Sequence, residues 1–112
     1  MVEIGEVAPQ FCLPGEGEQE ICLSSYQGKW LVLYFYPRDN TSGCTREAVD
    51  FTAILPQLSD LGAEVLGISR DSPASHKKFA EKNALGIKLA SDADHRVTEA
   101  YGAWALKKMY GK

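Results

Sequence analysis

Long hydrophobic runs are missing from this sequence, and so is any excess of positive charge. No segment approaches the roughly 20 apolar residues that a membrane-spanning helix needs, so we expect no membrane partner. Residues 1–6 carry two acidic side chains and no apolar core, which is unlike a secretory signal peptide. Lysine and arginine number 12 against 15 aspartates and glutamates, and this net charge of −3 argues against nucleic acid or an anionic membrane as the main partner.

Cysteine and histidine are also scarce. Three cysteines are an odd number and predict no disulfide framework, so a reducing, cytoplasmic setting is the expectation. The cysteines and the two histidines show neither Cys-x-x-Cys nor His-x-x-His spacing, so no zinc site is expected. The remaining composition, 45% apolar and 24% charged over 112 residues, is typical of one globular domain spanning residues 1–112.

Apolar periodicity and turn residues predict a β-hairpin followed by alternating strands and helices. The segment Trp30–Tyr36 is continuously apolar, as expected of a central strand covered on both faces. A helix is expected from about Ser42 to Leu61, kinked or split at Pro56. The other expected features are strands at 11–13, 21–23, 64–69 and 87–90, a turn at 24–29, a C-cap at Gly62, a helix opened by Ser72-Pro73 and a last helix capped by Asp92 or Asp94. This alternation implies an α/β fold with a largely parallel sheet.

One segment combines features that point to chemistry. A strand ends at Pro37, a polar turn follows, and Cys44 falls in the first turn of the next helix. Backbone N–H groups there have no partner within the helix, and the helix dipole favours negative charge. A thiol in that position becomes a thiolate, the reactive form, more readily. We therefore predict that Cys44 is a nucleophile beyond the carboxyl end of a strand; the alternative is a buried structural thiol.

The same segment resembles that of a known family. Pro37-x-x-x-Thr41-x-x-Cys44 resembles the active-site signature of peroxiredoxins, and the longer string 34–45 resembles their Q-type subfamily, the bacterioferritin comigratory proteins. Further matches in the same order lie at 8–14, 62–69, 75–79, 100–104 and 107–112. The resemblance covers nearly the whole chain. It implies a thioredoxin-like, three-layer fold with a central mixed, largely parallel sheet and an N-terminal β-hairpin.

The resemblance also implies a thiol-dependent peroxidase that reduces hydrogen peroxide and small organic hydroperoxides without a cofactor or metal. Cys44 would be the peroxidatic cysteine, whose thiolate attacks the terminal peroxide oxygen and becomes a sulfenic acid. Thr41 would aim its hydroxyl at the thiolate and the peroxide, and Pro37 would shield the thiolate. Backbone N–H groups around Gly43 and Cys44 would stabilise the developing charge. Thioredoxin or a low-molecular-weight thiol would recycle the enzyme, which we expect to be a monomer or weak dimer.

The polar residues near this segment receive no catalytic role. Asp39, Asn40 and Arg46 only flank it. His76 lies beside two lysines on a helix face that looks charged, so we predict a solvated side chain. The same prediction applies to His95, near the start of the last helix.

Two positions that hold a second, resolving cysteine in many Q-type members hold no thiol in this sequence. One is Val49, five residues after Cys44 on the same helix, and the other matches Ala80. The sulfenic acid would then be reduced by an outside thiol, or by Cys12 or Cys22. The alternative is that Val49 or Ala80 stands in place of a cysteine through mutagenesis.

The sequence also ends before features that the resemblance implies. In the family, an arginine beyond the Tyr-Gly-Lys segment supports the thiolate, and a strand pair and a final helix follow. We therefore expect residues 1–112 to be a C-terminally truncated form of a longer protein. One edge of strand 31–36 would then be exposed, or covered by something else.

Cys12 and Cys22 fall on one face of the predicted hairpin, opposite its apolar side chains. If residue 12 pairs with residue 22, the two thiols are cross-strand neighbours. We favour two unrelated surface thiols. The alternative is a second redox pair, or a resolving thiol for Cys44.

Two other classes of function stay open beside the peroxidase. The first is a non-catalytic thioredoxin-like domain that acts as a redox sensor or a binding module. The second, a thioredoxin-type disulfide reductase, is disfavoured because no Cys-x-x-Cys is present.

Overall fold

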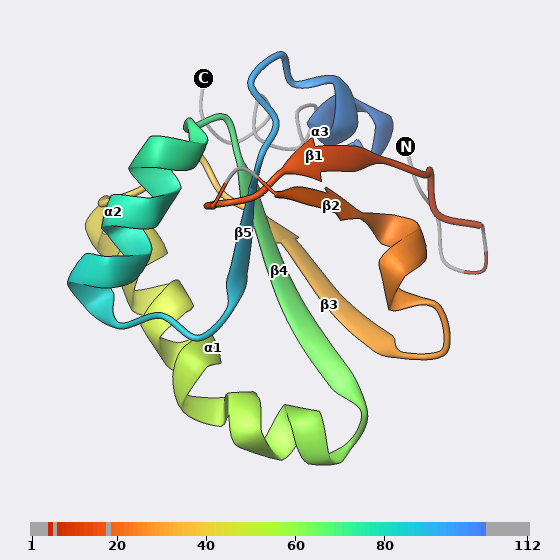
Figure 1. Cartoon of the computed structure of the whole chain (residues 1–112), viewed down its shortest axis with the longest axis horizontal. Coiled ribbons are helices and arrows are strands. Elements are labelled where there is room, and N and C mark those ends of the chain that lie inside the picture. The colour runs from red at the N-terminus through yellow and green to blue at the C-terminus, as the bar shows by residue number, and fades with distance from the viewer. Residues whose placement is uncertain (1–4, 6, 18, 103–112) are drawn as a thin grey trace.

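The computed structural model describes residue 5, residues 7–17 and residues 19–102, and its elements follow the predicted order (Figure 1). The elements are β1 (Cys12–Pro14), β2 (Glu20–Cys22), the 3₁₀-helix η1 (Leu23–Tyr26), β3 (Trp30–Phe35), α1 (Ser42–Asp60), β4 (Ala63–Ser69), α2 (Pro73–Asn83), β5 (Lys88–Ser91) and α3 (Arg96–Ala100). The matched segment 103–112 lies outside the described residues. Within the described part of the chain, none of the helices is both long and apolar enough to span a membrane.

Three layers pack on one another, which confirms the predicted α/β architecture. The helices α1 and α2 cover one face of the sheet, and the antiparallel hairpin β1–β2 with η1 covers the other (Figure 1). Alternation along β4 divides the core accordingly, because Leu66 and Ile68 pack toward the hairpin while Val65 packs toward the helices. The site region therefore rests on a sheet that is buried on both faces.

The central strand of the described sheet is β4 rather than β3. The strand order is β3-β4-β5, with both pairs parallel. Among the described residues, β3 pairs on one side only, and Trp30 at its start is 78% exposed. The prediction of a central strand was therefore wrong for this sheet. The apolar run arises because β3 packs against a layer on each face, Leu33 toward the hairpin and Tyr34 toward the helices.

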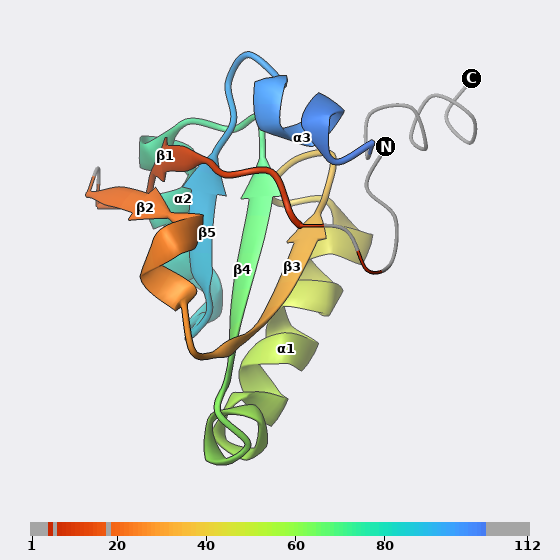
Figure 2. The same cartoon turned by 90° about the vertical axis from the view of Figure 1, so that its right-hand side faces the viewer.

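The long helix α1 is a single element with Pro56 inside it. Thr41 is its N-cap in an extended conformation, and the buried Ala48 packs it against the sheet. Leu61 is the C-cap, and Gly62 follows with φ of 78°, a left-handed conformation that glycine adopts without steric cost. These ends agree with the prediction, and they fix the start of α1 at the carboxyl end of β3 (Figure 2).

The caps of the two later helices also follow the sequence. The hydroxyl of Ser72 accepts a hydrogen bond from the backbone N–H of Ser75 at 3.1 Å and starts α2. For α3 the prediction holds only in part, because the N-cap residue is His95, while both predicted acids accept hydrogen bonds from N–H groups of the first turn. The fully buried Asp92 carboxylate accepts from the N–H groups of Val97 and Thr98 and from the Thr98 hydroxyl.

Candidate active site around Cys44

The geometry of the site begins with the first turn of α1. Thr45 donates the first helical hydrogen bond, to the carbonyl of Thr41 at 2.9 Å. The N–H groups of Ser42, Gly43 and Cys44 precede it, so helix geometry provides them with no acceptor inside the helix. Cys44 is a free, half-buried thiol within this turn, and it packs at the edge of the core between the sheet and α1. The thiol therefore lies where backbone donors and the helix dipole favour an anion.

The other predicted site residues lie on the same short segment. Thr41 is half-buried, makes no side-chain capping bond, and donates its hydroxyl to the carbonyl of Arg38 at 3.4 Å. Pro37 is exposed directly after β3. Gly43 is exposed, and a Cβ atom there would meet nothing within 4 Å. The backbone thus gathers Thr41, Gly43 and Cys44 at one helix start, with Pro37 at the end of the preceding strand.

An aromatic wall lies beneath this helix start. The ring of Tyr34 lies 4.9 Å from that of Phe51 on α1 and 5.6 Å from that of Tyr36, measured between centroids. Burial, followed by the negative charges of Glu47 and Cys44, raises the pKa of Tyr34 well above its usual value. Its buried hydroxyl has no hydrogen-bond partner among the described residues. Tyr34 is therefore a protonated, unpaired O–H group in the electrostatic neighbourhood of the thiol.

An open hollow of about 390 Å³ adjoins the helix start on the outer side of α1. Gly43 lies on its lining with Phe51, and charged side chains of both signs complete it, at Arg46, Glu47 and Asp50, beside Ile54. Of the predicted site residues, Gly43 lies on this lining, whereas Cys44, Thr41 and Pro37 do not.

A buried polar network anchors the segment that leads to Cys44. Asp39 is only 6% exposed, and its carboxylate accepts from the Tyr36 hydroxyl at 2.6 Å and from the Ser75 hydroxyl at 2.8 Å. His76 is fully buried, with Nδ1 2.8 Å from Oδ2 of Asp39 and Nε2 3.0 Å from the carbonyl of Ala90. The prediction that His76 is solvated was therefore wrong, and Asp39 does more than flank the site.

The physical reason for this correction is helical spacing. His76, Phe79 and Ala80 are three and four residues apart on α2, and all three are buried against the sheet. The neighbouring Lys77 and Lys78 are exposed, so the local charge pattern misled the sequence interpretation. The apolar residues Phe79 and Ala80, three and four positions after His76, were the sequence signal that His76 faces the sheet.

Burial alone would raise the pKa of Asp39, but hydrogen bonds from His76, Tyr36 and Ser75 and the charge of His76 bring it below its ordinary value. The carboxyl group is therefore held as a carboxylate. The backbone N–H of Asp39 also donates to Asp71 at 2.8 Å, and Asp71 accepts from the hydroxyl of Ser69 at 2.7 Å. The loop after β3 is thus tied to both α2 and the end of β4.

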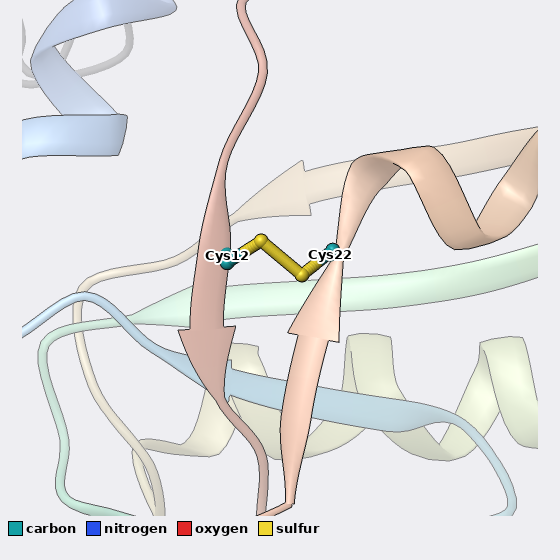
Figure 3. Close-up of a disulfide and its surroundings, with 2 residues drawn as sticks. All are labelled: Cys12 and Cys22. Carbon is teal, nitrogen blue, oxygen red and sulfur yellow. A yellow bond between two sulfur atoms is a disulfide. The ribbon is translucent and has the colours of Figure 1, made fainter.

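Cys12 and Cys22 form a disulfide across the hairpin, with an S–S distance of 2.07 Å (Figure 3). The favoured interpretation as two unrelated surface thiols was therefore wrong. The pairing of residue 12 with residue 22, on which the alternative of a redox pair depended, is observed. The two residues alternate with Leu13 and Ile21, which pack inward, so the bond lies on the outer face of the hairpin. Cys44 packs on the helix side of the sheet, so the structure does not bring it together with either cysteine.

The positions expected for a resolving cysteine differ in exposure. Val49 is 41% exposed on α1, and Ala80 is 7% exposed on α2. His95, which was predicted to be solvated, is half-buried at the N-cap of α3 in a left-handed conformation.

The sequence is similar to that of known proteins over nearly its whole length. The model of the AhpC/TSA family matches residues 4–111. Peroxiredoxin Bcp of Bacillus subtilis is 45% identical over 111 residues, which cover 99% of this chain and 71% of that protein. Peroxiredoxin Bcp of Escherichia coli is 40% identical, with the same coverage of 99% and 71%.

Solved structures of similar proteins have the same fold. Peroxidoxin BcpB of Mycobacterium tuberculosis superimposes with a TM-score of 0.83 at 33% identity, over 88% of this chain and 64% of that one. Peroxiredoxin Q of Xanthomonas campestris superimposes with a TM-score of 0.80 at 42% identity, over 91% of this chain and 65% of that one. The chain thus spans about 71% of the two curated relatives and 64 to 65% of these solved chains.

Proposed function

The chain belongs to the AhpC/TSA family and to its thiol-dependent peroxidases, the peroxiredoxins, and we propose that Cys44 is its peroxidatic cysteine. The observation that carries this proposal is the placement of a free, half-buried thiol in the first turn of α1. Unpaired N–H groups and the helix dipole stabilise the thiolate and the charge that develops on the peroxide.

The proposed reaction is a displacement at oxygen. The Cys44 thiolate attacks the terminal oxygen of a hydroperoxide, an S–O bond forms, and the O–O bond breaks. The leaving oxygen takes up a proton and departs as water or an alcohol, and the sulfur is left as a sulfenic acid. In this proposal the Thr41 hydroxyl, which donates to the Arg38 carbonyl at 3.4 Å in the resting chain, turns to the reacting atoms when the peroxide binds. Pro37 limits access of water, and Gly43 supplies a backbone donor without a side chain in the way.

Recycling in this proposal uses an outside thiol, either thioredoxin or a low-molecular-weight thiol. Val49 and Ala80 carry no sulfur, and Cys12 and Cys22 are joined on the far side of the sheet. The outside thiol condenses with the sulfenic acid, releasing water and leaving a mixed disulfide. A second thiol then displaces Cys44 and forms a disulfide with the first. We further propose that residues 1–112 form one domain that acts in the cytoplasm as a monomer or weak dimer.

The test is peroxide consumption by the purified chain with dithiothreitol as the reductant. We expect turnover of hydrogen peroxide and of a small organic hydroperoxide, complete loss of turnover in Cys44→Ser, and retention in the double variant Cys12→Ser/Cys22→Ser. Equal consumption by the wild-type chain and Cys44→Ser would exclude the proposal. A folded chain without turnover would instead favour a redox sensor or binding module.

A second redox function is favoured by one observation, the exposure of Cys12 in the hairpin disulfide. We propose that this disulfide exchanges with outside thiols independently of Cys44. The attacking thiolate would bond to one sulfur and release the other as a thiolate. Incubation of Cys44→Ser in glutathione buffers, followed by mass measurement of trapped thiols, tests it. Reduction over the range of cellular buffers supports the proposal, and a disulfide that persists throughout contradicts it.

A further inference from the structure

We propose that the buried pair of Asp39 and His76 is the positioning unit of the active-site segment. On this account, His76 is held as an imidazolium that donates from both ring nitrogens, and it keeps the loop between β3 and α1 in the conformation that places Cys44. The inference rests on the proposed role of Cys44 and goes beyond it, because it assigns a function to two residues that take no part in the proposed reaction.

The hydrogen-bond inventory of Asp39 is the first step. One carboxylate oxygen accepts from the Tyr36 hydroxyl at 2.6 Å, and the other accepts from the Ser75 hydroxyl at 2.8 Å and faces Nδ1 of His76 at 2.8 Å. Each hydroxyl has one proton to donate. Since the Tyr36 hydroxyl donates its proton to Asp39, it cannot also donate to Nδ1 of His76, which lies 3.4 Å from the same hydroxyl.

The protonation state of His76 follows from its own two neighbours. Nε2 faces the carbonyl oxygen of Ala90 at 3.0 Å, and a carbonyl can only accept. Nδ1 faces a carboxylate, which also accepts. A neutral imidazole carries one N–H group, so its other ring nitrogen would present a lone pair to an oxygen acceptor at 2.8 or 3.0 Å, whereas the imidazolium donates to both oxygens. The side chains of His76 and Asp39 are 0% and 1% exposed, so water does not replace a missing proton.

The surrounding charges agree with a cation at this position. Asp39 reaches the ring from the loop, and Tyr36 from the end of β3. Glu16 of the hairpin turn has a pKa raised by burial, and the charge of His76 opposes that rise. Asp71, at the end of β4, holds the backbone of Asp39 from the other side. Ser75 on α2 and the Ala90 carbonyl on β5 complete the surroundings with neutral groups.

The consequence for Cys44 comes from chain connectivity. Asp39 lies two residues before Thr41, the N-cap of α1, and Asn40 between them has a φ of 68°, which turns the chain into the helix. Fixing the side chain of Asp39 to α2 and its N–H to Asp71 therefore fixes the start of α1. Removing one member of a buried ion pair leaves the other charge uncompensated, so the loop is expected to move when His76 is lost.

The experiment combines a spectroscopic signature with a rate. Spectra of the wild-type chain with ¹⁵N-labelled histidine rings should show two bound ring protons on His76 near neutral pH, and Asp39→Asn should remove one of them while the chain stays folded. One ring proton in the wild-type chain would overturn the assignment. This readout needs no peroxide, so it stands apart from any failure of the proposed peroxidase function.

The rate measured is oxidation of Cys44 by hydrogen peroxide, well below the melting temperature of each variant. His76→Gln should slow it by about ten- to a hundredfold, because small displacements of reacting groups are that costly. If His76→Gln does not fold, Ser75→Ala takes its place. It removes a single hydrogen bond to Asp39 and should slow the oxidation of Cys44 by a smaller factor. The matched control is the exposed neighbour Lys77→Gln, which should stay within about twofold of wild type. A folded His76→Gln that reacts at the wild-type rate would overturn the proposal. If that variant does not fold, a folded Ser75→Ala that reacts at the wild-type rate would overturn it.

Discussion

The ring of Tyr34 fills the space that a side chain on Gly67 would need. The two residues are paired across β3 and β4, and a Cβ atom on Gly67 would lie 2.8 Å from Cζ of Tyr34. The close approach lets the ring lie beside β4 and contact Phe51 on α1. The aromatic wall beneath Cys44 therefore depends on a glycine in the neighbouring strand.

Gly67→Ala should destabilise the fold, because the added methyl meets a packed ring rather than open space. We expect a loss of about 1–3 kcal/mol in the free energy of unfolding. Urea denaturation followed by circular dichroism measures it. The matched control is the same substitution at Gly43, where a Cβ meets nothing within 4 Å. Gly43→Ala should leave stability unchanged or raise it by up to about 1 kcal/mol, since alanine favours a helix. Equal effects of the two substitutions would contradict this packing account.

The buried Asp39 carboxylate should make stability depend on acidic pH. Its pKa is lowered in the folded chain from an ordinary value of 3.8, so its contribution is complete above that value and is lost as pH falls through the lower folded value. Unfolding free energies of the wild-type chain and Asp39→Asn, measured between about pH 5 and pH 3, below the range in which histidine titrates, test this. The difference between their unfolding free energies should become smaller as pH falls. A gap that stays constant over this range would show that the carboxylate charge is not what stabilises the loop.

Asp92 should matter more for stability than Asp94, although both accept hydrogen bonds from the first turn of α3. The Asp92 carboxylate is fully buried and accepts three hydrogen bonds, while Asp94 accepts one from the N–H of Arg96 at an exposed site. Asp92→Ala leaves buried donors unsatisfied and should cost about 1–3 kcal/mol or more. Asp94→Ala should cost less than about 1 kcal/mol. Thermal melts of both variants decide the order, and a larger loss in Asp94→Ala would refute it.

Reduction of the hairpin disulfide should lower stability without slowing Cys44. The bond closes a loop with a sequence separation of 10 residues, for which chain entropy gives about 2–3 kcal/mol. Denaturation of Cys12→Ser/Cys22→Ser against the oxidised wild-type chain measures that loss. Its peroxide reaction should match the wild type, since the disulfide and Cys44 lie on opposite sides of the sheet. A large change in the rate would show that the two sites communicate.

Much of the fold and the core of the site could be predicted from sequence, because those features are local. The strand, turn and helix start around Cys44 occupy one continuous segment, and alternation placed Cys12 and Cys22 on the same face of the hairpin. Helix α1 was predicted nearly to the residue, since Gly62 closes it.

Most of the errors concern contacts between distant parts of the chain; the burial of His76 is the exception, because its spacing from Phe79 and Ala80 on α2 indicated it. Strand order is set by packing between distant segments, so the apolar pattern of β3 could not show that β4 lies at the centre. The Asp39–His76 pair joins residues 37 positions apart, and the sequence around either residue does not indicate that the other is its partner. Oxidation of the Cys12–Cys22 pair depends on the distance between two sulfur atoms, which the residue types do not determine.

The central claim is that Cys44 is the thiol that peroxide oxidises, and one competition within the molecule tests it most directly. The fully reduced chain is mixed with less than one equivalent of hydrogen peroxide in the presence of a sulfenic-acid trap, and the label on each cysteine is located by peptide mapping. We predict that the label falls on Cys44, with little on Cys12 or Cys22. Label spread evenly over the three cysteines, or an unlabelled Cys44, would contradict the account.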